Sequence, residues 1–200
     1  MSTSTQGGEG RSHWNVPNTL TWLRILMIPA IFALFYLLPY PWADPAACTA
    51  FALAGITDTL DGYYARKLGQ TSRLGAFLDP VADKLIVAAA LVLIVSKDPR
   101  WFMVIVSVVI IGREIAVSAL REWMAEIGAR SRIKVSLLGK YKTIMQIVGL
   151  SFLLFRQNIL GIPIYKLGLA LTGVAAVLTL WSMVQYLRVA WPELRGSARL

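Results

Sequence analysis

The chain has 200 residues, of which 56% are hydrophobic, and its mean hydropathy is +0.60. This composition excludes an ordinary soluble domain of this size and indicates one membrane domain of several helices, because each span needs about 20 apolar residues. The formal charge of +9 comes from 20 Lys and Arg against 11 Asp and Glu. In a chain this apolar, we expect the excess cations to face anionic lipid headgroups or an anionic substrate, and not nucleic acid.

The predicted elements follow a polar N-terminal segment. Residues 1–13 are rich in Ser, Thr and Gly without hydrophobic periodicity, which predicts a disordered tail. Residues 14–190 are expected to form the membrane domain, and residues 191–200 a cytoplasmic tail. Pro, Gly or charged residues separate the apolar stretches that follow, so we predict an all-α, integral membrane bundle of antiparallel transmembrane helices. The six stretches are 20–39, 46–66, 76–96, 101–121, 141–158 and 164–187.

Basic residues alternate between the connections of this predicted bundle. The connection after the first stretch has no Lys or Arg, whereas those after the second and fourth are strongly basic. Because basic loops stay on the cytoplasmic side of a membrane, we expect both termini and these two connections to be cytoplasmic. The basic residues concerned are Arg66, Lys67, Arg73, Arg130, Arg132, Lys134, Lys140 and Lys142.

Four aspartates interrupt the second and third apolar stretches. Asp58 and Asp61 are three residues apart and Asp79 and Asp83 four apart, so each pair shares one helix face. An ionised carboxylate at bilayer depth costs at least a few kcal/mol, so the four require bound cations or protonation. Oxygen ligands without His or Cys select Mg²⁺ or Mn²⁺, and four carboxylates are enough for two ions. The predicted orientation puts this cluster near the cytoplasmic headgroups.

Two other interpretations of the aspartates remain open at this point. They could be protonated, or could join helices by pairing with Arg24, Lys84 or Arg113. They could also relay ions in a transporter, but such sites typically lie near the bilayer midplane between inverted repeats. These acids cluster at one end and no internal repeat is detectable, which favours a metal-dependent enzyme.

The spacing of these residues resembles a family signature. The pattern Asp58-x-x-Asp61-Gly62-x-x-Ala65-Arg66, eight residues, then Gly75-x-x-x-Asp79-x-x-x-Asp83 is similar to that of the CDP-alcohol phosphotransferases at all eight positions. Similarity to bacterial members that use sn-glycerol 3-phosphate extends over nearly all of the chain after residue 14. It is carried by Asn15-Val16-Pro17-Asn18, Thr21, Arg24, Gly112-Arg113-Glu114 and the stretch 119–146, which contains Lys134-Val135-Ser136 and Gly139-Lys140.

The resemblance implies a six-helix enzyme, usually a homodimer, in the bacterial inner membrane with its active site facing the cytoplasm. It would transfer the phosphatidyl group of CDP-diacylglycerol to sn-glycerol 3-phosphate and release CMP, in the biosynthesis of anionic phospholipids. By this resemblance, Asp58, Asp61, Asp79 and Asp83 would bind the two divalent cations, and Asp83 would also be the general base. Contacts to CDP-diacylglycerol would come from Asn18, Gly62, Ala65, Arg66, Ser72 and Gly75.

The acceptor phosphate would also need cations, and Arg113 lies inside the fourth apolar stretch. It either meets the acceptor phosphate or pairs within the membrane with an acid such as Glu114. Arg121, Lys134, Lys140 and Lys142 could complete the acceptor pocket, or could anchor the cytoplasmic loops. A sister enzyme that uses serine, inositol phosphate or another alcohol is the closest alternative, although the basic group favours a phosphorylated acceptor.

Overall fold

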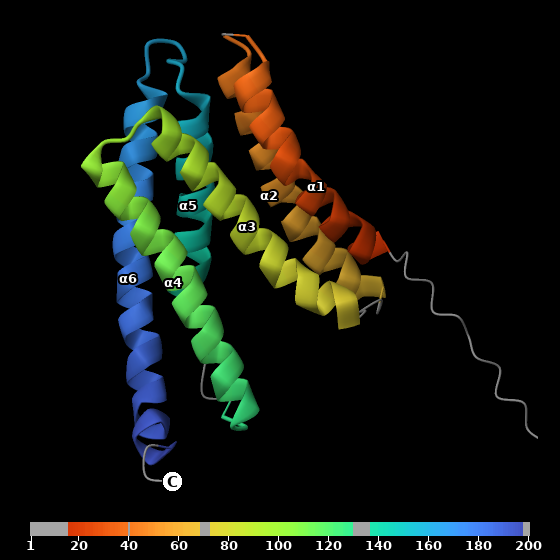
Figure 1. Ribbon diagram of the computed structural model, residues 1–200, viewed down its shortest axis with the longest axis vertical. Helices are drawn as coiled ribbons and strands as arrows, with labels where there is room; N and C mark the ends of the chain where they lie inside the picture. The colour runs from red at the N-terminus through yellow and green to blue at the C-terminus, as the bar shows by residue number, and fades with distance from the viewer. Residues whose placement is uncertain (1–15, 40, 69–72, 130–136, 198–200) are drawn as a thin grey trace, which may run out of the picture.

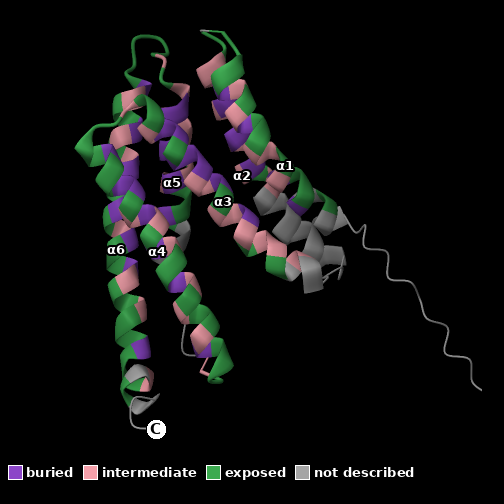
Figure 2. Ribbon diagram, viewed as in Figure 1, coloured by how far each residue is buried: buried purple, intermediate pink, exposed green. Residues whose placement is uncertain are grey.

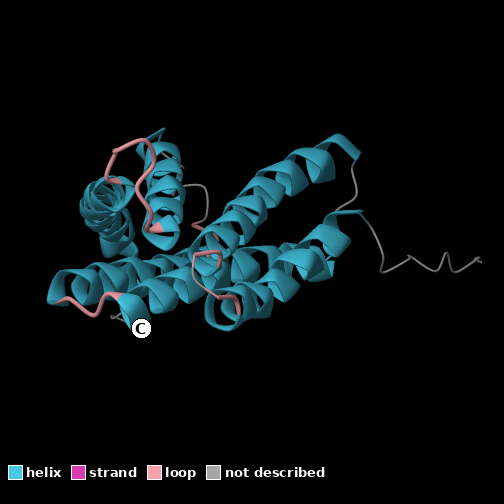
Figure 3. Ribbon diagram, turned by 90° about the horizontal axis from the view of Figure 1, so that it is seen from above, coloured by secondary structure: helices cyan, strands magenta, loops and turns pink. Residues whose placement is uncertain are grey.

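The computed structural model describes residues 16–39, 41–68, 73–129 and 137–197 and is helical throughout apart from short connections (Figure 3). The prediction of an all-α fold with six helices is confirmed, and these described ranges contain no strand beyond one isolated bridge between Ile159 and Ile162. The predicted tail at residues 1–13 lies outside the described residues. The helices are α1 (Val16–Leu37), α2 (Ala43–Leu68), α3 (Arg73–Lys97), α4 (Trp101–Glu126), α5 (Leu137–Phe155) and α6 (Ile164–Ser197) (Figure 1).

The helices alternate in direction, so their connections gather at two ends of the molecule. The α1–α2, α3–α4 and α5–α6 connections lie at the upper end of Figure 1, and the C-terminus lies at the lower end. The most extensive helix pairs are α1 with α2 and α5 with α6, and α3 runs between the two pairs and contacts both. This arrangement places the beginning of α3, which carries two of the aspartates, in the half of the molecule away from these three connections.

The apolar core lies mainly toward the upper end. Buried side chains are concentrated where the helices face one another (Figure 2). The core combines large side chains with alanines, which allow the helices to approach closely. It contains Ile31, Phe35, Ala47, Phe51, Ala54, Ile86, Ala90, Leu91, Leu93, Ile94, Met103, Val106, Ile110, Leu150, Leu153 and Leu154. Buried apolar side chains also continue along α4 and α6, at Val117, Met124 and Ala190.

Two glycines set the distance between α5 and α6. A Cβ atom added at Gly168 would lie 3.0 Å from the backbone oxygen of Gly149 and 3.0 Å from the backbone nitrogen of Leu153. A Cβ at Gly149 would meet the Thr172 side chain at 2.5 Å. Small residues at helix contacts are typical of packing inside membranes, where backbone proximity replaces a hydrophobic driving force.

The surface of the helices is apolar, whereas several charged and hydroxyl side chains are inside. Leu26, Val108, Val177 and Trp181 are each more than half exposed. Two described segments, Trp101–Glu126 and Ile164–Glu193, are long and apolar enough to cross a membrane, and Thr21–Leu37 and Tyr141–Phe155 are shorter apolar helices. Large exposed apolar faces, together with polar side chains buried between the helices, are the distribution of a membrane protein. The buried polar side chains are Thr21, Arg24, Ser107, Arg113, Lys142, Gln146, Thr172, Thr179 and Ser182.

Candidate active site

The two aspartates of α3 face a single arginine on α1. Nη1 of Arg24 lies 3.1 Å from Oδ1 of Asp79 and 2.6 Å from Oδ1 of Asp83. Asp79 and Asp83 are one helical turn apart, so their carboxylates lie on the same face of α3 and can be reached by one guanidinium. The pairing with Arg24 that the sequence left open as an alternative is therefore present.

Burial is unequal across this ion-pair group. Arg24 is 1% exposed, whereas the side chains of Asp79 and Asp83 remain 41% and 44% exposed. The guanidinium thus lies on the buried side of the group, and the carboxylates lie on its solvent-exposed side. One positive charge faces two negative charges, and the accessible sides of both carboxylates are open to a cation from solution.

This donor set fits a hard divalent cation. Both acids offer carboxylate oxygens, the ligand type that Mg²⁺ and Mn²⁺ prefer, and both are accessible. In the part of the chain that the structure describes, no group of three or more His, Cys, Asp or Glu residues could hold a metal ion. The other two predicted ligands, Asp58 and Asp61, lie in α2, but their side chains are outside the described residues.

The predicted contacts to the liponucleotide lie on the same three helices. Asn18 belongs to the first turn of α1, Gly62, Ala65 and Arg66 to the last turns of α2, and Gly75 to the first turn of α3. Gly75 is partly buried, and the side chains at positions 18, 65 and 66 are not described. Ser72 falls within residues 69–72, outside the described ranges.

A second charged group joins α4, α5 and α6. Nη1 of Arg113 donates to Oε1 of Glu114 at 3.0 Å, and Nζ of Lys142 donates to the same oxygen at 2.8 Å. Nη2 of Arg113 donates to Oγ of Ser182 at 2.9 Å. The side chains of Arg113 and Lys142 are 9% and 5% exposed, so two buried cations share one carboxylate. The predicted alternative of an Arg113 and Glu114 pair is present, together with a second cation.

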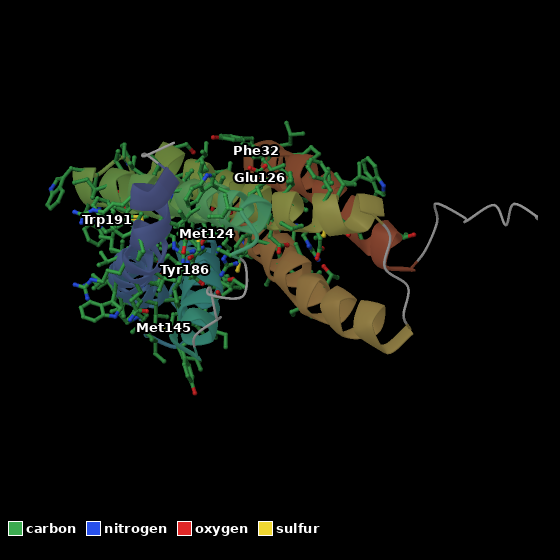
Figure 4. All side chains as sticks on the ribbon, turned by 90° about the horizontal axis from the view of Figure 1, so that it is seen from below. Phe32, Met124, Glu126, Met145, Tyr186 and Trp191 are labelled. Atoms are coloured by element: carbon green, nitrogen blue, oxygen red, sulfur yellow. The ribbon has the colours of Figure 1, made fainter. Side chains whose placement is uncertain are left out.

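This second group, called the base-rich group below, consists of Arg113, Glu114, Lys142 and Ser182, and it extends to the ring of Tyr186. The guanidinium carbon of Arg113 lies 5.8 Å from the ring centroid and that of Arg121 lies 5.1 Å from it. Nη2 of Arg121 also donates to the Tyr186 hydroxyl at 2.5 Å. Figure 4 shows Tyr186 and Met124 inside the group formed by α4, α5 and α6. The Nε of Arg113 is buried with no hydrogen-bond partner among the described residues.

The structure thus unites Arg113, Arg121 and Lys142, three of the five residues predicted to bind the acceptor phosphate. Lys134 lies in residues 130–136, outside the described ranges, and the side chain of Lys140 is not described. Ser182 and Tyr186 were not predicted as site residues. The buried charge of Arg113 inside an apolar stretch is the signal that could have prompted a search for such partners on α6.

Comparison with known proteins identifies the family. Residues 14–184 match the sequence profile of the family described as CDP-alcohol phosphatidyltransferase. The chain is 49% identical over 181 residues to proteins named CDP-diacylglycerol--glycerol-3-phosphate 3-phosphatidyltransferase from Salmonella choleraesuis (strain SC-B67), Shigella flexneri serotype 5b and Escherichia coli (strain K12). Each comparison covers 90% of this chain and 97% of the relative. The profile match, this similarity and the carboxylate pair of α3 agree: the chain belongs to the CDP-alcohol phosphatidyltransferase family.

Proposed function

We infer that this protein transfers the phosphatidyl group of CDP-diacylglycerol to sn-glycerol 3-phosphate, which gives phosphatidylglycerophosphate and CMP. The observation that carries this function is the 49% identity, across 97% of their length, to relatives named for that reaction. Sequence similarity of this extent covers the acceptor side of the molecule as well as the aspartate signature. The base-rich group on α4, α5 and α6 supports a phosphorylated acceptor over serine, because a neutral or zwitterionic alcohol would not need buried cations.

On this proposal the aspartates form the catalytic centre. Asp58, Asp61, Asp79 and Asp83 would hold two divalent cations, Mg²⁺ or Mn²⁺, which members of this family generally require. Bound there, the metals would neutralise charge on the pyrophosphate and on the CMP leaving group. Asp83 would accept the proton of the attacking glycerol hydroxyl, a role that its accessible carboxylate allows. Arg24 orients both carboxylates of α3 by donating a hydrogen bond to one oxygen of each.

The base-rich group would bind the acceptor phosphate. Glu114 holds the side chains of Arg113 and Lys142 toward a common point, and Ser182 fixes the second Arg113 nitrogen. An arriving phosphate can then be met by donors that are already ordered, so that little side-chain entropy is lost on binding. Together with Asn18, Gly62, Ala65, Arg66, Ser72 and Gly75 on the liponucleotide side, these residues would place the hydroxyl for in-line attack on the phosphorus.

We further propose that all six helices cross the bacterial inner membrane. The aspartates, the base-rich group and both termini would then face the cytoplasm, where sn-glycerol 3-phosphate is dissolved. This orientation agrees with the basic α2–α3 and α4–α5 connections. The proposal includes a homodimer as the functional unit, as the family resemblance implies.

One experiment tests the function. Purified protein in detergent with CDP-diacylglycerol is offered sn-glycerol 3-phosphate, inositol phosphate or serine in parallel, with Mg²⁺, with Mn²⁺ or with a chelator. We expect CMP release only with glycerol phosphate and only with a divalent cation. Release with another acceptor at an equal rate would identify a sister enzyme, and ion flux in liposomes without CMP release would identify a transporter.

A further inference from the structure

A cavity of about 600 Å³ opens at the end of the molecule opposite to the aspartates. It lies among the end of α1, the beginning of α2, the end of α3 and the end of α5. Lys97 is 14 residues beyond Asp83 on α3, or about 21 Å along the helix axis at 1.5 Å per residue. The cavity is therefore separate from the transferase site. Its polar lining includes Tyr36, Asp44, Lys97, Arg156 and Gln157.

Two cations and one acid line this cavity. Nζ of Lys97 lies 5.2 Å from the ring centroid of Phe35 and 5.9 Å from that of Tyr36, at the aromatic wall. Nε of Arg156 lies 3.8 Å from Oδ2 of Asp44, near the limit of an ion pair. The lining thus has a net positive charge, and neither cation is held by a short charge-assisted hydrogen bond among the described residues. A ligand with one negative charge would balance it.

The backbone at Arg156 has a conformation that is unusual for a residue with a side chain. Arg156 follows the last residue of α5 and has φ 58°, in the left-handed region. Glycine is the usual residue at such a helix end, because a Cβ in this conformation is sterically unfavourable. An arginine occupies this position and lines the cavity.

The surroundings of the cavity are those of a membrane surface. Leu37, Trp42, Trp101 and Leu160 all lie at this end and are strongly exposed. Tryptophans flanked by exposed aliphatic side chains are typical of the headgroup layer, where the ring has an apolar body and a polar edge. A ligand that combines a phosphate with acyl chains would match both the charged lining and this apolar rim.

We propose that this cavity binds the phosphate of an anionic lipid headgroup at the membrane face opposite to the aspartates. Arg156 and Lys97 contact the phosphate, and the amide of Gln157, which already donates to the Pro41 oxygen at 2.7 Å, stiffens the wall between α5 and the α1–α2 connection. The shared chemistry is a phosphate group, which a dissolved phosphate could also supply. The experiment has separate arms for the two sources.

The test measures how fast Lys97 reacts with an amine-selective reagent, quantified by peptide mass spectrometry of the full-length protein in lipid nanodiscs. The arms contain phosphatidylcholine alone, phosphatidylcholine with added inorganic phosphate, or a mixture with phosphatidylglycerol. Lys166, an exposed lysine near the same end that does not line the cavity, is the internal control. With headgroup at about ten times its Kd, we expect the Lys97 rate to fall about tenfold in the phosphatidylglycerol arm only.

The variant Arg156→Gln should abolish this protection of Lys97 while CMP release by the same nanodiscs stays unchanged, since Arg156 lies outside the catalytic groups. Equal protection of Lys97 by inorganic phosphate would mean that the cavity binds a dissolved anion, and it would overturn the lipid assignment. Equal slowing of Lys97 and Lys166 would reveal a general surface-charge effect, and protection that survives in Arg156→Gln would exclude the proposed contact. Either result would overturn the site itself.

Discussion

Two charged groups in the lower half of the molecule are built in opposite ways. On α1 and α3, one buried arginine faces two half-exposed carboxylates, Asp79 and Asp83. On α4 and α5, one carboxylate, Glu114, faces two buried cations, Arg113 and Lys142. In each group, one side chain of one charge contacts two side chains of the opposite charge.

The difference shows which ligand each group is suited to receive. A lone charge inside an apolar bundle is costly, so each excess is tolerated only near the surface or beside a partner of opposite sign. The acid-rich group, formed by Arg24, Asp79 and Asp83, suits a cation, and the base-rich group suits an anion. A metal-dependent transfer to a phosphorylated acceptor needs one of each.

Removing one carboxylate from the acid-rich group should have the largest effect. We expect Asp79→Asn or Asp83→Asn to lower phosphatidyl transfer by about 10³-fold, because each change removes a metal ligand and Asp83→Asn also removes the general base. The measurement is incorporation of labelled glycerol phosphate, with membrane insertion followed by fractionation. Asp98→Asn, which alters an aspartate at the other end, is the matched control. Wild-type transfer by either site variant would refute the catalytic assignment.

Removing the minority charge of the same group tests whether Arg24 organises it. In Arg24→Gln the two carboxylates lose their buried partner, and because solvent partly screens them we expect a loss of about 1–2 kcal/mol of stability and a lower transfer rate. Mn²⁺ should then raise the thermal midpoint of the variant more than that of the wild type, because the metal becomes the main counter-charge. Arg24→Lys, which keeps the charge, should be milder. An unchanged midpoint in Arg24→Gln would contradict this role.

The base-rich group is tested by its effect on the acceptor alone. We expect Arg113→Ala to raise the KM for glycerol phosphate by about 10- to 100-fold, the value of one or two charge-assisted hydrogen bonds, with a smaller change for CDP-diacylglycerol. Arg188→Ala removes an exposed cation from α6 and should leave both constants unchanged. If the acceptor KM in Arg113→Ala matched the wild type at full turnover, the phosphate-binding proposal would be wrong.

The contrast between the groups was only partly predictable from the sequence. Hydropathy predicted all six helices, because long apolar stretches and their polar breaks are local signals. Helical spacing likewise predicted that Asp79 and Asp83 share a face. Which basic residue they meet depends on how α1 packs on α3, and the sequence left Arg24, Lys84 and Arg113 open as partners. Whether Asp58 and Asp61 join them stays a prediction.

Contacts between distant helices explain what the sequence missed. Ser182 and Tyr186 lie on α6 and reach Arg113 only because α4 and α6 are neighbours in space. The end of α6 also differed: the helix continues through Ser197, beyond the apolar stretch that ends at residue 187. Hydropathy marks where a helix can lie in lipid, and the backbone continues for as long as its hydrogen bonds allow.

The close contact between α5 and α6 supports the base-rich group, so a substitution that separates these helices should affect both stability and acceptor binding. We expect Gly168→Ala to destabilise the protein by about 1–3 kcal/mol, because the added Cβ meets backbone atoms of α5 that cannot rotate away. Since Lys142 and Ser182 lie on these two helices, the acceptor KM should also rise modestly. Gly112→Ala, where a Cβ would meet nothing within 4 Å, is the control and should keep or raise the thermal midpoint. Equal midpoints for the two variants would contradict the close approach.

A balanced ion pair at the opposite end should give the smallest effect. Asp98 accepts from Nε and Nη2 of Arg100 at 2.7 and 2.6 Å and also from the Tyr165 hydroxyl, and these bonds, that of Arg100 first, lower the pKa of Asp98 to about 2. Because the folded-state pKa is depressed, this stabilisation is present above about pH 4 and is lost as the pH falls toward 2. Asp98→Asn should lower the thermal midpoint at pH 7 by about 2 °C and leave transfer unchanged, since neither charge is in excess. A loss of transfer in this variant would mean that balanced and unbalanced groups do not differ in function.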